Sequence, residues 1–174
     1  IVKYYYKKEG RFNAIKSESD NILFLNSYNF NFFPKIINNN NKFLIMSFID
    51  NNNDLPIKTN DDLLGAIISL HSKRSNNYGF NFDTQIGGLM QSNSNSKSWV
   101  EFYSDKRLHY IFDLINKKQP MDKAINTKIE LLLKKIDNFI PNKPKPSLLH
   151  GDLWEGNILF KNKKFSGFID PGSF

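Results

Sequence analysis

The sequence predicts an α+β fold of two lobes, and three observations support this prediction. The first fifty residues have the pattern strand, helix, strand, strand. Apolar side chains then recur at helical spacing over much of residues 60–139. The chain closes with a short hairpin pattern that carries acidic and amide side chains. We therefore expect a β-rich lobe over residues 1–49 and a mostly helical lobe over residues 50–174, which begins with a polar linker.

The first lobe is predicted from alternation and helical periodicity. Residues 1–6 are β-branched and aromatic, which is typical of a strand. Residues 13–27 follow a helical pattern. The apolar residues expected on its buried face are Ile15, Ile22, Leu23 and Leu25. Two further strand patterns, 32–37 and 42–49, flank a run of asparagines and predict a hairpin.

The second lobe is predicted to contain three helices and one long loop. Asn60 is expected to cap the first helix, because an Asn side chain can accept a hydrogen bond from a free N–H of the first turn. Its expected buried stripe is Leu63, Leu64, Ile67, Ile68 and His71. Residues 78–95 lack periodicity and are too long for an ordinary connection, so we expect an irregular binding loop. Helices are predicted over residues 98–117 and 121–139.

Composition narrows the possible classes of protein. A hydrophobic content of 40% predicts a folded domain, and the absence of cysteine excludes disulfides and thiolate chemistry. That absence fits a reducing compartment, so we expect a cytoplasmic protein. No segment approaches the roughly 18 apolar residues of a membrane helix, so no membrane partner is expected. The net charge of +7 comes from dispersed lysines, which predicts a solvated basic surface without a nucleic-acid partner. The oligomeric state is not indicated.

The residues with the clearest chemical pattern lie near the end of the chain. His150, Gly151 and Asp152 follow an apolar pair, and Asn157 lies five positions after Asp152. Asp170 follows the next apolar run. Phosphoryl transfer needs a cation on the phosphates, oxygen ligands for it and a base that positions the acceptor hydroxyl. Mg²⁺ prefers carboxylate, amide and water oxygens. The pattern therefore predicts a site for Mg²⁺ and a phosphate chain.

Two residues at the start of the chain could complete such a site. Lys3 lies in the first strand pattern and Glu18 in the following helix, so an ion pair between them could direct the lysine at nucleotide phosphates. Each residue also has a structural interpretation, since Lys3 could be an ordinary strand lysine and Asp152 and Asn157 could favour turns. His150 is expected to be structural, because phosphoryl transfer needs only the aspartate as base.

Three blocks of the sequence resemble one known family. His150-Gly151-Asp152 with Asn157 is shared by most small-molecule kinases of the protein-kinase-like fold. Leu153-Trp154 before Gly156-Asn157, and Ile169-Asp170-Pro171, are similar to the forms found in fructosamine kinases (ketosamine-3-kinases). The segments Tyr78 to Asp83, Gln91 to Asn93 and Trp99 to Arg107 resemble that family's region near the acceptor site. The resemblance covers essentially the whole chain.

The resemblance implies a role for each candidate residue in the fold shared with aminoglycoside phosphotransferases and choline kinases. The implied catalytic base is Asp152, and the implied magnesium ligands are Asn157 and Asp170. The nucleotide-binding residues would be Lys3 and Glu18 at the phosphates and the hinge residues Met46, Ser47 and Phe48 at the adenine. By analogy, the acceptor would be contacted by Trp154, Trp99 and Arg107. The implied cofactors are ATP and Mg²⁺.

The implied reaction phosphorylates the 3-hydroxyl of a ketosamine, free or protein-bound, which makes the sugar adduct labile and implies deglycation repair. The family's Gly-rich loop is expected before Ile1 and further helices after Phe174, so we interpret the chain as truncated at both ends. One alternative is a kinase for another small acceptor, such as an aminoglycoside, choline or a hydroxylated amine. The other is a non-catalytic module, either a pseudokinase or a basic nucleic-acid binder.

Overall fold

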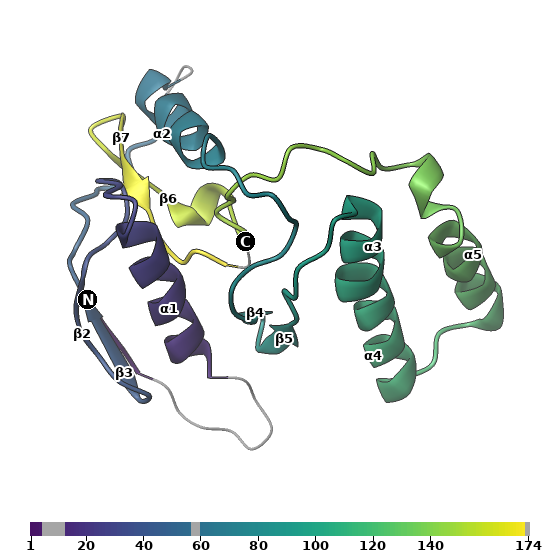
Figure 1. The fold of residues 1–174 in the computed structure, drawn as a ribbon. Helices are drawn as coiled ribbons and strands as arrows, with labels where there is room; N and C mark the ends of the chain where they lie inside the picture. Colours follow the sequence, from purple (N-terminus) through teal and green to yellow (C-terminus); the bar gives the residue numbers. More distant parts are fainter. Residues whose placement is uncertain (5–12, 57–59, 173–174) are drawn as a thin grey trace. The chain divides into compact units, whose positions relative to one another are not determined.

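The computed structural model describes residues 1–4, 13–56 and 60–172 (Figure 1). It divides into two compact units. The first comprises Ile1–Lys73, Thr84–Met90 and Leu148–Phe174, and the second comprises Arg74–Asp83 and Gln91–Ser147. Each unit is described by itself below. The predicted boundary between lobes at residues 49 and 50 stays a prediction.

A three-stranded antiparallel sheet and one helix begin the first unit. The strands β1 (Val2–Tyr4), β2 (Ile36–Asn39) and β3 (Phe43–Met46) lie in the order β1-β3-β2. The helix α1 (Ala14–Asn26) starts at Asn13, whose side chain accepts a hydrogen bond from the Lys16 N–H at 3.0 Å. The residues that pack this helix on the sheet are Ile15, Ile22, Leu44 and Met46. This packing places α1 beside the strand that carries Lys3.

The second core of this unit supports the hairpin at the end of the chain. The strands β6 (Ile158–Lys161) and β7 (Lys164–Phe168) pair antiparallel after a single 3₁₀ turn (Glu155–Asn157). Phe168 is fully buried with side chains from α1, the segment after it and α2 (Asp61–His71). The other buried members of this cluster are Leu25, Phe30, Phe33, Ala66 and Leu70. Because Phe168 anchors β7, the position of Asp170 two residues later is set by the core.

Two expectations about buried helix faces need correction. In α2 the apolar side chains on the core are Leu63, Ala66, Ile67 and Leu70. Leu64 and Ile68 are 48% and 59% exposed, because a helix with 3.6 residues per turn directs positions 63, 66, 67 and 70 to one side. In α1, Leu23 is 49% exposed whereas the polar Asn21 is buried. The predicted helices are therefore correct, and the residues predicted to face the core are partly wrong.

The long loop predicted over residues 78–95 is not wholly irregular. It contains two short strands, β4 (Thr84–Ile86) and β5 (Leu89–Gln91), which pair as a hairpin. Gly87 and Gly88 link them with φ of 56° and 83°, values that glycine adopts without strain. A Gly-Gly pair between two short runs is a signal for such a turn, and the Gly- and Ser-rich surroundings concealed it.

The second unit is mostly helical. The helices α3 (Trp99–Tyr103) and α4 (Tyr110–Lys118) continue through a π-helical segment (Ser104–His109), so the predicted helix over residues 98–117 is confirmed. The helix α5 (Lys123–Leu133) ends before its predicted limit at 139, and a 3₁₀ turn (Ile136–Asn138) follows. In the described residues of the two units, no helix combines the length and apolar character required to cross a membrane.

Gly79 makes a testable contribution to the second unit. Its φ is 111°, and an added Cβ would lie 2.5 Å from the backbone oxygen of Asn93. We expect Gly79→Ala to lower the free energy of unfolding by about 1–3 kcal/mol, the range for backbone strain of this kind. Thermal denaturation with hydrogen exchange over residues 74–83 measures the loss.

The matched control is Gly65→Ala. Gly65 lies inside α2, and an added Cβ there meets no atom within 4 Å. Because alanine is the better helix former, this change should stabilise the protein by about 0.5–1 kcal/mol. Equal effects of the two substitutions would contradict the strain assigned to position 79.

Candidate active site

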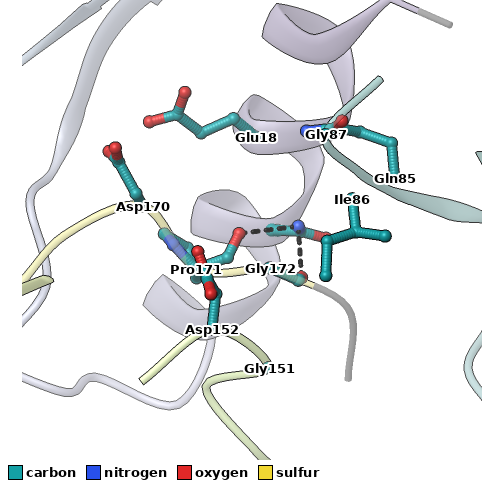
Figure 2. A pocket seen from close by; sticks show the side chains of 10 residues that line it. Glu18, Gln85, Ile86, Gly87, Gly151, Asp152, Asp170, Pro171 and Gly172 are labelled. Carbon is teal, nitrogen blue, oxygen red and sulfur yellow. Dashed lines mark hydrogen bonds between the residues drawn. The ribbon is translucent and has the colours of Figure 1, made fainter. Parts of the chain in front are cut away.

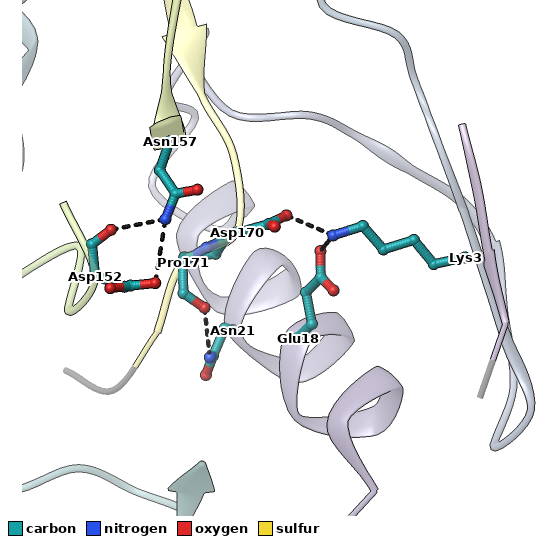
Figure 3. Close-up of polar contacts among 7 residues, drawn as sticks. All are labelled: Lys3, Glu18, Asn21, Asp152, Asn157, Asp170 and Pro171. Atoms are coloured by element: carbon teal, nitrogen blue, oxygen red, sulfur yellow. Dashed lines mark hydrogen bonds and ion pairs between the residues drawn. The ribbon is translucent and has the colours of Figure 1, made fainter. Parts of the chain in front are cut away.

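Lys3 is the centre of a three-residue ionic cluster in the first unit. Its Nζ donates to Glu18 Oε1 at 2.7 Å and also contacts Asp170 Oδ1 (Figure 3). The side chains of Lys3, Glu18 and Asp170 are 32%, 15% and 48% exposed. The structure therefore brings together a strand lysine, a helix glutamate and the acid after β7. The ion pair between the lysine and the glutamate was predicted from the sequence.

The pKa shifts in this cluster follow from one cation facing two carboxylates. Burial alone would lower the pKa of Lys3, but the charge of Glu18 and hydrogen bonds to Asp170 and Glu18 outweigh it and raise that pKa above 10.5. Burial raises the pKa of Glu18, with a further contribution from Asp170, while Lys3 opposes the shift. Lys3 therefore keeps its positive charge at neutral pH.

Asp152 and Asn157 are joined across the loop that precedes β6. The Asn157 Nδ2 donates to the backbone oxygen of Asp152 at 2.8 Å and to Asp152 Oδ2 at 3.2 Å. Asn157 is buried and Asp152 is exposed. Since both hydrogen bonds use the amide nitrogen, the amide oxygen of Asn157 has no hydrogen-bond partner in the described residues. That oxygen and the Asp170 carboxylate are the donor types that Mg²⁺ takes, so the two residues fit the predicted ion.

A larger metal cluster is not present in the part of the chain that the structure describes. No group of three or more His, Cys, Asp or Glu side chains there is arranged to hold a metal ion. The candidate site offers two ligand side chains, one carboxylate and one amide. Two such ligands suit an ion that keeps several waters and phosphate oxygens as its other ligands.

His150 has a structural role, as predicted. Its ring is 1% exposed and lies between Phe33, with centroids 5.9 Å apart, and Phe168, at 5.5 Å. Burial lowers the pKa of His150 below 6.5. The nearby backbone of Ile169 and Asp152 and the charges of Asp152 and Asp170 only partly oppose this shift, and neither ring nitrogen has a hydrogen-bond partner in the described residues. The imidazole is therefore held neutral inside the core.

This burial predicts acid sensitivity. Below pH 6.5 the unfolded state binds a proton on His150 that the folded state disfavours, so the free energy of unfolding should fall as the pH is lowered. One group can contribute at most about 1.4 kcal/mol per pH unit. Denaturant titrations from pH 7.5 to 5 measure the slope. His150→Phe keeps an aromatic ring and should show a shallower decline, and identical slopes would refute the assignment.

The backbone around Asp170 is held in an uncommon conformation. Asp170 has φ of 53°, in the left-handed region that Asp enters more readily than most residues. On one side the Ile169 N–H donates to Asn157 O at 3.1 Å. On the other, the Gly172 N–H donates to His150 O at 2.9 Å. These bonds tie the segment carrying Asp170 to the loop carrying Asp152.

The acids open onto a pocket within the first unit. Its lining includes Glu18, Asp152 and Asp170, and the tip of the β4–β5 hairpin at Gln85 to Gly87. Figure 2 shows the carboxylates on one side of the pocket and the Gln85 and Ile86 side chains on the other. The pocket is the space in which a phosphate chain could approach the acids.

The structure shows which backbone N–H groups of the predicted hinge already have hydrogen-bond partners. Met46 lies in β3, is 3% exposed and donates its N–H to Ile1 O at 3.0 Å. The Ser47 N–H donates to Lys35 O at 2.8 Å, and Ser47 Oγ accepts the Lys35 N–H at 2.9 Å. Phe48 is 64% exposed, and its own peptide groups make no backbone hydrogen bond within the described residues. Of the three N–H groups, that of Phe48 is therefore the one without a backbone partner among residues 1–4, 13–56 and 60–172, and it could meet an adenine.

The three residues assigned by analogy to the acceptor lie in both units. Trp154, in the first unit, is 58% exposed, and its ring lies over Gly156, where an added Cβ would be 2.3 Å from it. Trp99, in the second unit, stacks on Phe102 and Tyr103.

Arg107, also in the second unit, is bonded to its own chain. It donates to Ser92 O at 2.9 Å and to Asn93 Oδ1 at 2.6 Å, and its guanidinium lies over the Phe102 ring. Burial lowers its pKa, and Tyr103 and Asp83 oppose the shift. Arg107 thus organises the segment at residues 92–93. An acceptor role for it stays a prediction.

Sequence reasoning missed three parts of this site. Asn21 lies three residues after Glu18 and so on the same side of α1, a spacing that could have identified it. The tip of the β4–β5 hairpin was hidden in the segment expected to be irregular. The other missed groups are backbone carbonyls, at Pro171 and Gly172, which no side-chain pattern reveals.

Comparison with known proteins places this geometry in a family. The sequence model described as fructosamine kinase matches residues 3–174. The chain is 35% identical over 136 residues to a chloroplastic protein-ribulosamine 3-kinase of Arabidopsis thaliana. That match covers 76% of this chain and 40% of the relative, so the chain spans well under half of the relative's length.

Solved structures show the same fold. A candidate fructosamine-3-kinase from Thermobifida fusca superimposes with a TM-score of 0.80 at 21% identity, over 99% of this chain and 59% of that chain. The ternary complex of streptomycin, ATP and APH(2")-IIa gives a TM-score of 0.63 at 18% identity, over 97% of this chain and 57% of that chain. At these identities the likeness establishes the fold alone, and it confirms the predicted kinase-like fold.

Proposed function

This chain belongs to the fructosamine kinase family, and from that premise we propose that the protein transfers the γ-phosphate of ATP to a sugar hydroxyl of a ketosamine. The observation that carries the proposal is the pocket onto which Glu18, Asp152 and Asp170 all open. The ionic cluster with Lys3 and the Asp152–Asn157 bonds supply a phosphate-directed cation, a base and two oxygen ligands around that one space. Phosphoryl transfer requires this set of groups.

Asp152 has the properties of the base. It is exposed, so an acceptor hydroxyl can reach it, and the amide of Asn157 restrains its carboxylate. Asp152 would take the proton of the hydroxyl as that oxygen bonds to the γ-phosphorus and ADP leaves. A positioned carboxylate contributes mainly by orientation in this chemistry.

Lys3, Asn157 and Asp170 would handle the nucleotide phosphates. Bound Mg²⁺ would neutralise the charge that develops on the phosphate oxygens. Asn157 Oδ1 and the Asp170 carboxylate would hold the ion. Lys3 would then direct its Nζ at the phosphates while Glu18, the less exposed of its partners, keeps the lysine in place. Adenine would meet the backbone of Phe48.

The physiological acceptor is proposed from the relatives. The Arabidopsis relative is named for ribulosamine, so we propose a ribulosamine or fructosamine, free or attached to a protein lysine. Removal of such adducts from proteins would be the cellular role. We also propose a cytoplasmic location, supported by the absence of cysteine. Cell fractionation tests that location.

An acceptor panel tests the proposed function. The full-length protein is incubated with ATP and Mg²⁺ and one of four acceptors: a ribulosamine, a fructosamine, an aminoglycoside or choline. ADP release is followed in each case, and the phosphorylated product is identified by mass spectrometry. We expect turnover with a ketosamine only. Phosphorylation of the aminoglycoside or choline alone would establish the alternative kinase, and nucleotide binding without turnover would establish a non-catalytic module.

A further inference from the structure

Asn21 links α1 to the backbone that follows Asp170. Its side chain is 2% exposed, and its Nδ2 donates to Pro171 O at 3.0 Å and to Gly172 O at 2.7 Å. Figure 3 shows Asn21 and Glu18 on the same side of the helix, with Asn21 reaching Pro171 while Glu18 reaches Lys3. One helix face therefore meets the Asp170 segment directly through Asn21 and indirectly through Glu18, whose partner Lys3 also contacts Asp170.

The segment from Asp170 to Gly172 needs such support. Asp170 lies in the left-handed region with φ of 53°, a conformation that persists only where surrounding contacts hold it. Gly172 is held on its other side by the hydrogen bond from its N–H to His150 O. An added Cβ at Gly172 would lie 3.0 Å from Asp152 Cβ, so the segment passes close to the Asp152 loop. A shift of the segment would therefore disturb both acids.

We propose that Asn21 is a positioning residue: its two hydrogen bonds hold the Asp170 segment against α1, so that Asp170 stays in register with Lys3, Glu18 and Asp152. The inference rests on the proposed function, since that function makes Asp170 a metal ligand. Asn21 belongs to the lining of the pocket, and in this scheme it acts through the backbone of Pro171 and Gly172 and not as a ligand of nucleotide or acceptor.

The chemistry of the amide explains why asparagine suits this position. Two carbonyl oxygens converge on it, and one NH₂ group offers two hydrogens to meet them. An aspartate would offer only lone pairs. The Asn21 Oδ1 is buried and has no partner in the described residues, so the hydrogen bonds of this side chain to the described chain are all donated. Removal of the amide takes away the donor that both carbonyl groups share.

Metal and nucleotide binding provide a test that needs no acceptor. We compare wild type, Asn21→Ala and Asn21→Leu by the binding of Mn²⁺ at saturating ADP, followed by electron paramagnetic resonance. Asn21→Leu keeps most of the side-chain volume without the donor. We expect Mn²⁺ affinity to fall about tenfold in both variants, the lower end of the effect of losing an outer partner of a metal ligand. Amide exchange at Gly172 should accelerate in both.

The matched control is Asn26→Ala. Asn26 lies on the same helix, and its Nδ2 donates to Pro34 O at 3.2 Å. Loss of that bond should change Mn²⁺ affinity and Gly172 exchange by less than the measurement error. In turnover assays, Asn21→Ala should raise the Mg²⁺ concentration for half-maximal rate and lower kcat, while KM for the acceptor stays near the wild-type value.

Several results would overturn the proposal. Folded Asn21→Ala and Asn21→Leu proteins with wild-type Mn²⁺ affinity and wild-type Gly172 exchange would do so. If neither variant folds, rapid solvent exchange of the Asn21 Nδ2 hydrogens in the wild-type protein would do so as well. A wild-type protein that binds Mn²⁺ and ADP, loses that binding in the variants and phosphorylates no ketosamine would overturn the proposed function and support the role of Asn21.

Discussion

Replacement of Asp152 by asparagine is expected to lower kcat by about two to four orders of magnitude, the range for loss of a positioned general base. The change keeps the size of the side chain, and its Oδ1 can still accept the hydrogen bond from Asn157 Nδ2, now 3.2 Å from Asp152 Oδ2. The loop should therefore keep its conformation. KM for ATP should change little, because Asp152 is not among the groups proposed to hold the nucleotide.

Steady-state kinetics with the ketosamine identified by the acceptor panel, together with ADP affinity by calorimetry, measure this prediction. Asp50→Asn is the control, since Asp50 belongs to the same unit and is exposed in an ion pair with Lys161. It should leave kcat unchanged. An Asp152→Asn enzyme that retained more than a tenth of the wild-type kcat would show that another group takes the proton.

Replacement of Lys3 by methionine is expected to lower kcat/KM for ATP on the order of 100-fold, comparable with loss of one preorganised charge-stabilising donor. Stability should also fall, because Glu18 and Asp170 would face each other without a cation. Removal of one partner from a buried pair costs about 3–5 kcal/mol, and exposed pairs contribute at most about 1 kcal/mol. Since Lys3 and Asp170 are partly exposed, we expect a loss of about 1–2 kcal/mol.

A double variant separates the two consequences. Lys3→Met with Glu18→Gln removes the like-charge repulsion, so it should recover most of the lost unfolding free energy and none of the ATP kinetics. Lys16→Met is the control, because Lys16 pairs with Asp20 on the same helix and is 59% exposed. Full recovery of kcat/KM in the double variant would mean that Lys3 acts through fold stability alone.

The elements of the fold followed from local pattern to different degrees. The helix beginning at Asn60 could be placed to the residue, because the Asn60 side chain accepts the Leu63 N–H at 3.0 Å as a cap should. Its buried side could not, since Leu64 and Ile68 are as apolar as the residues that pack on β7. The helical pattern shows which apolar residues lie along one broad stripe of the helix. Which of them are buried depends on the elements against which the helix packs.

The candidate site likewise contains features that the sequence predicted and contacts that it did not. Asp152 and Asn157 are five residues apart, so the sequence predicted that one loop carries both, and the structure added the hydrogen bonds between them. Lys3 and Glu18 were paired from their order and their predicted elements, and the 2.7 Å contact agrees. The additional contact between Lys3 and Asp170 was not foreseen, because 167 positions separate them and no local pattern relates the two.

The sequence by itself determined the family, the order of the main helices and strands and the candidate residues of the site, because those depend on residue type and short spacing. The tertiary structure alone decided how they meet: that Asp170 adopts a left-handed backbone, that His150 is held neutral between Phe33 and Phe168, and that Asn21 holds Pro171 and Gly172 across 150 positions. Backbone carbonyls carry no sequence signature, and contacts of such separation are set by the packing of whole elements. The physical support of the site therefore becomes visible only when the chain is folded.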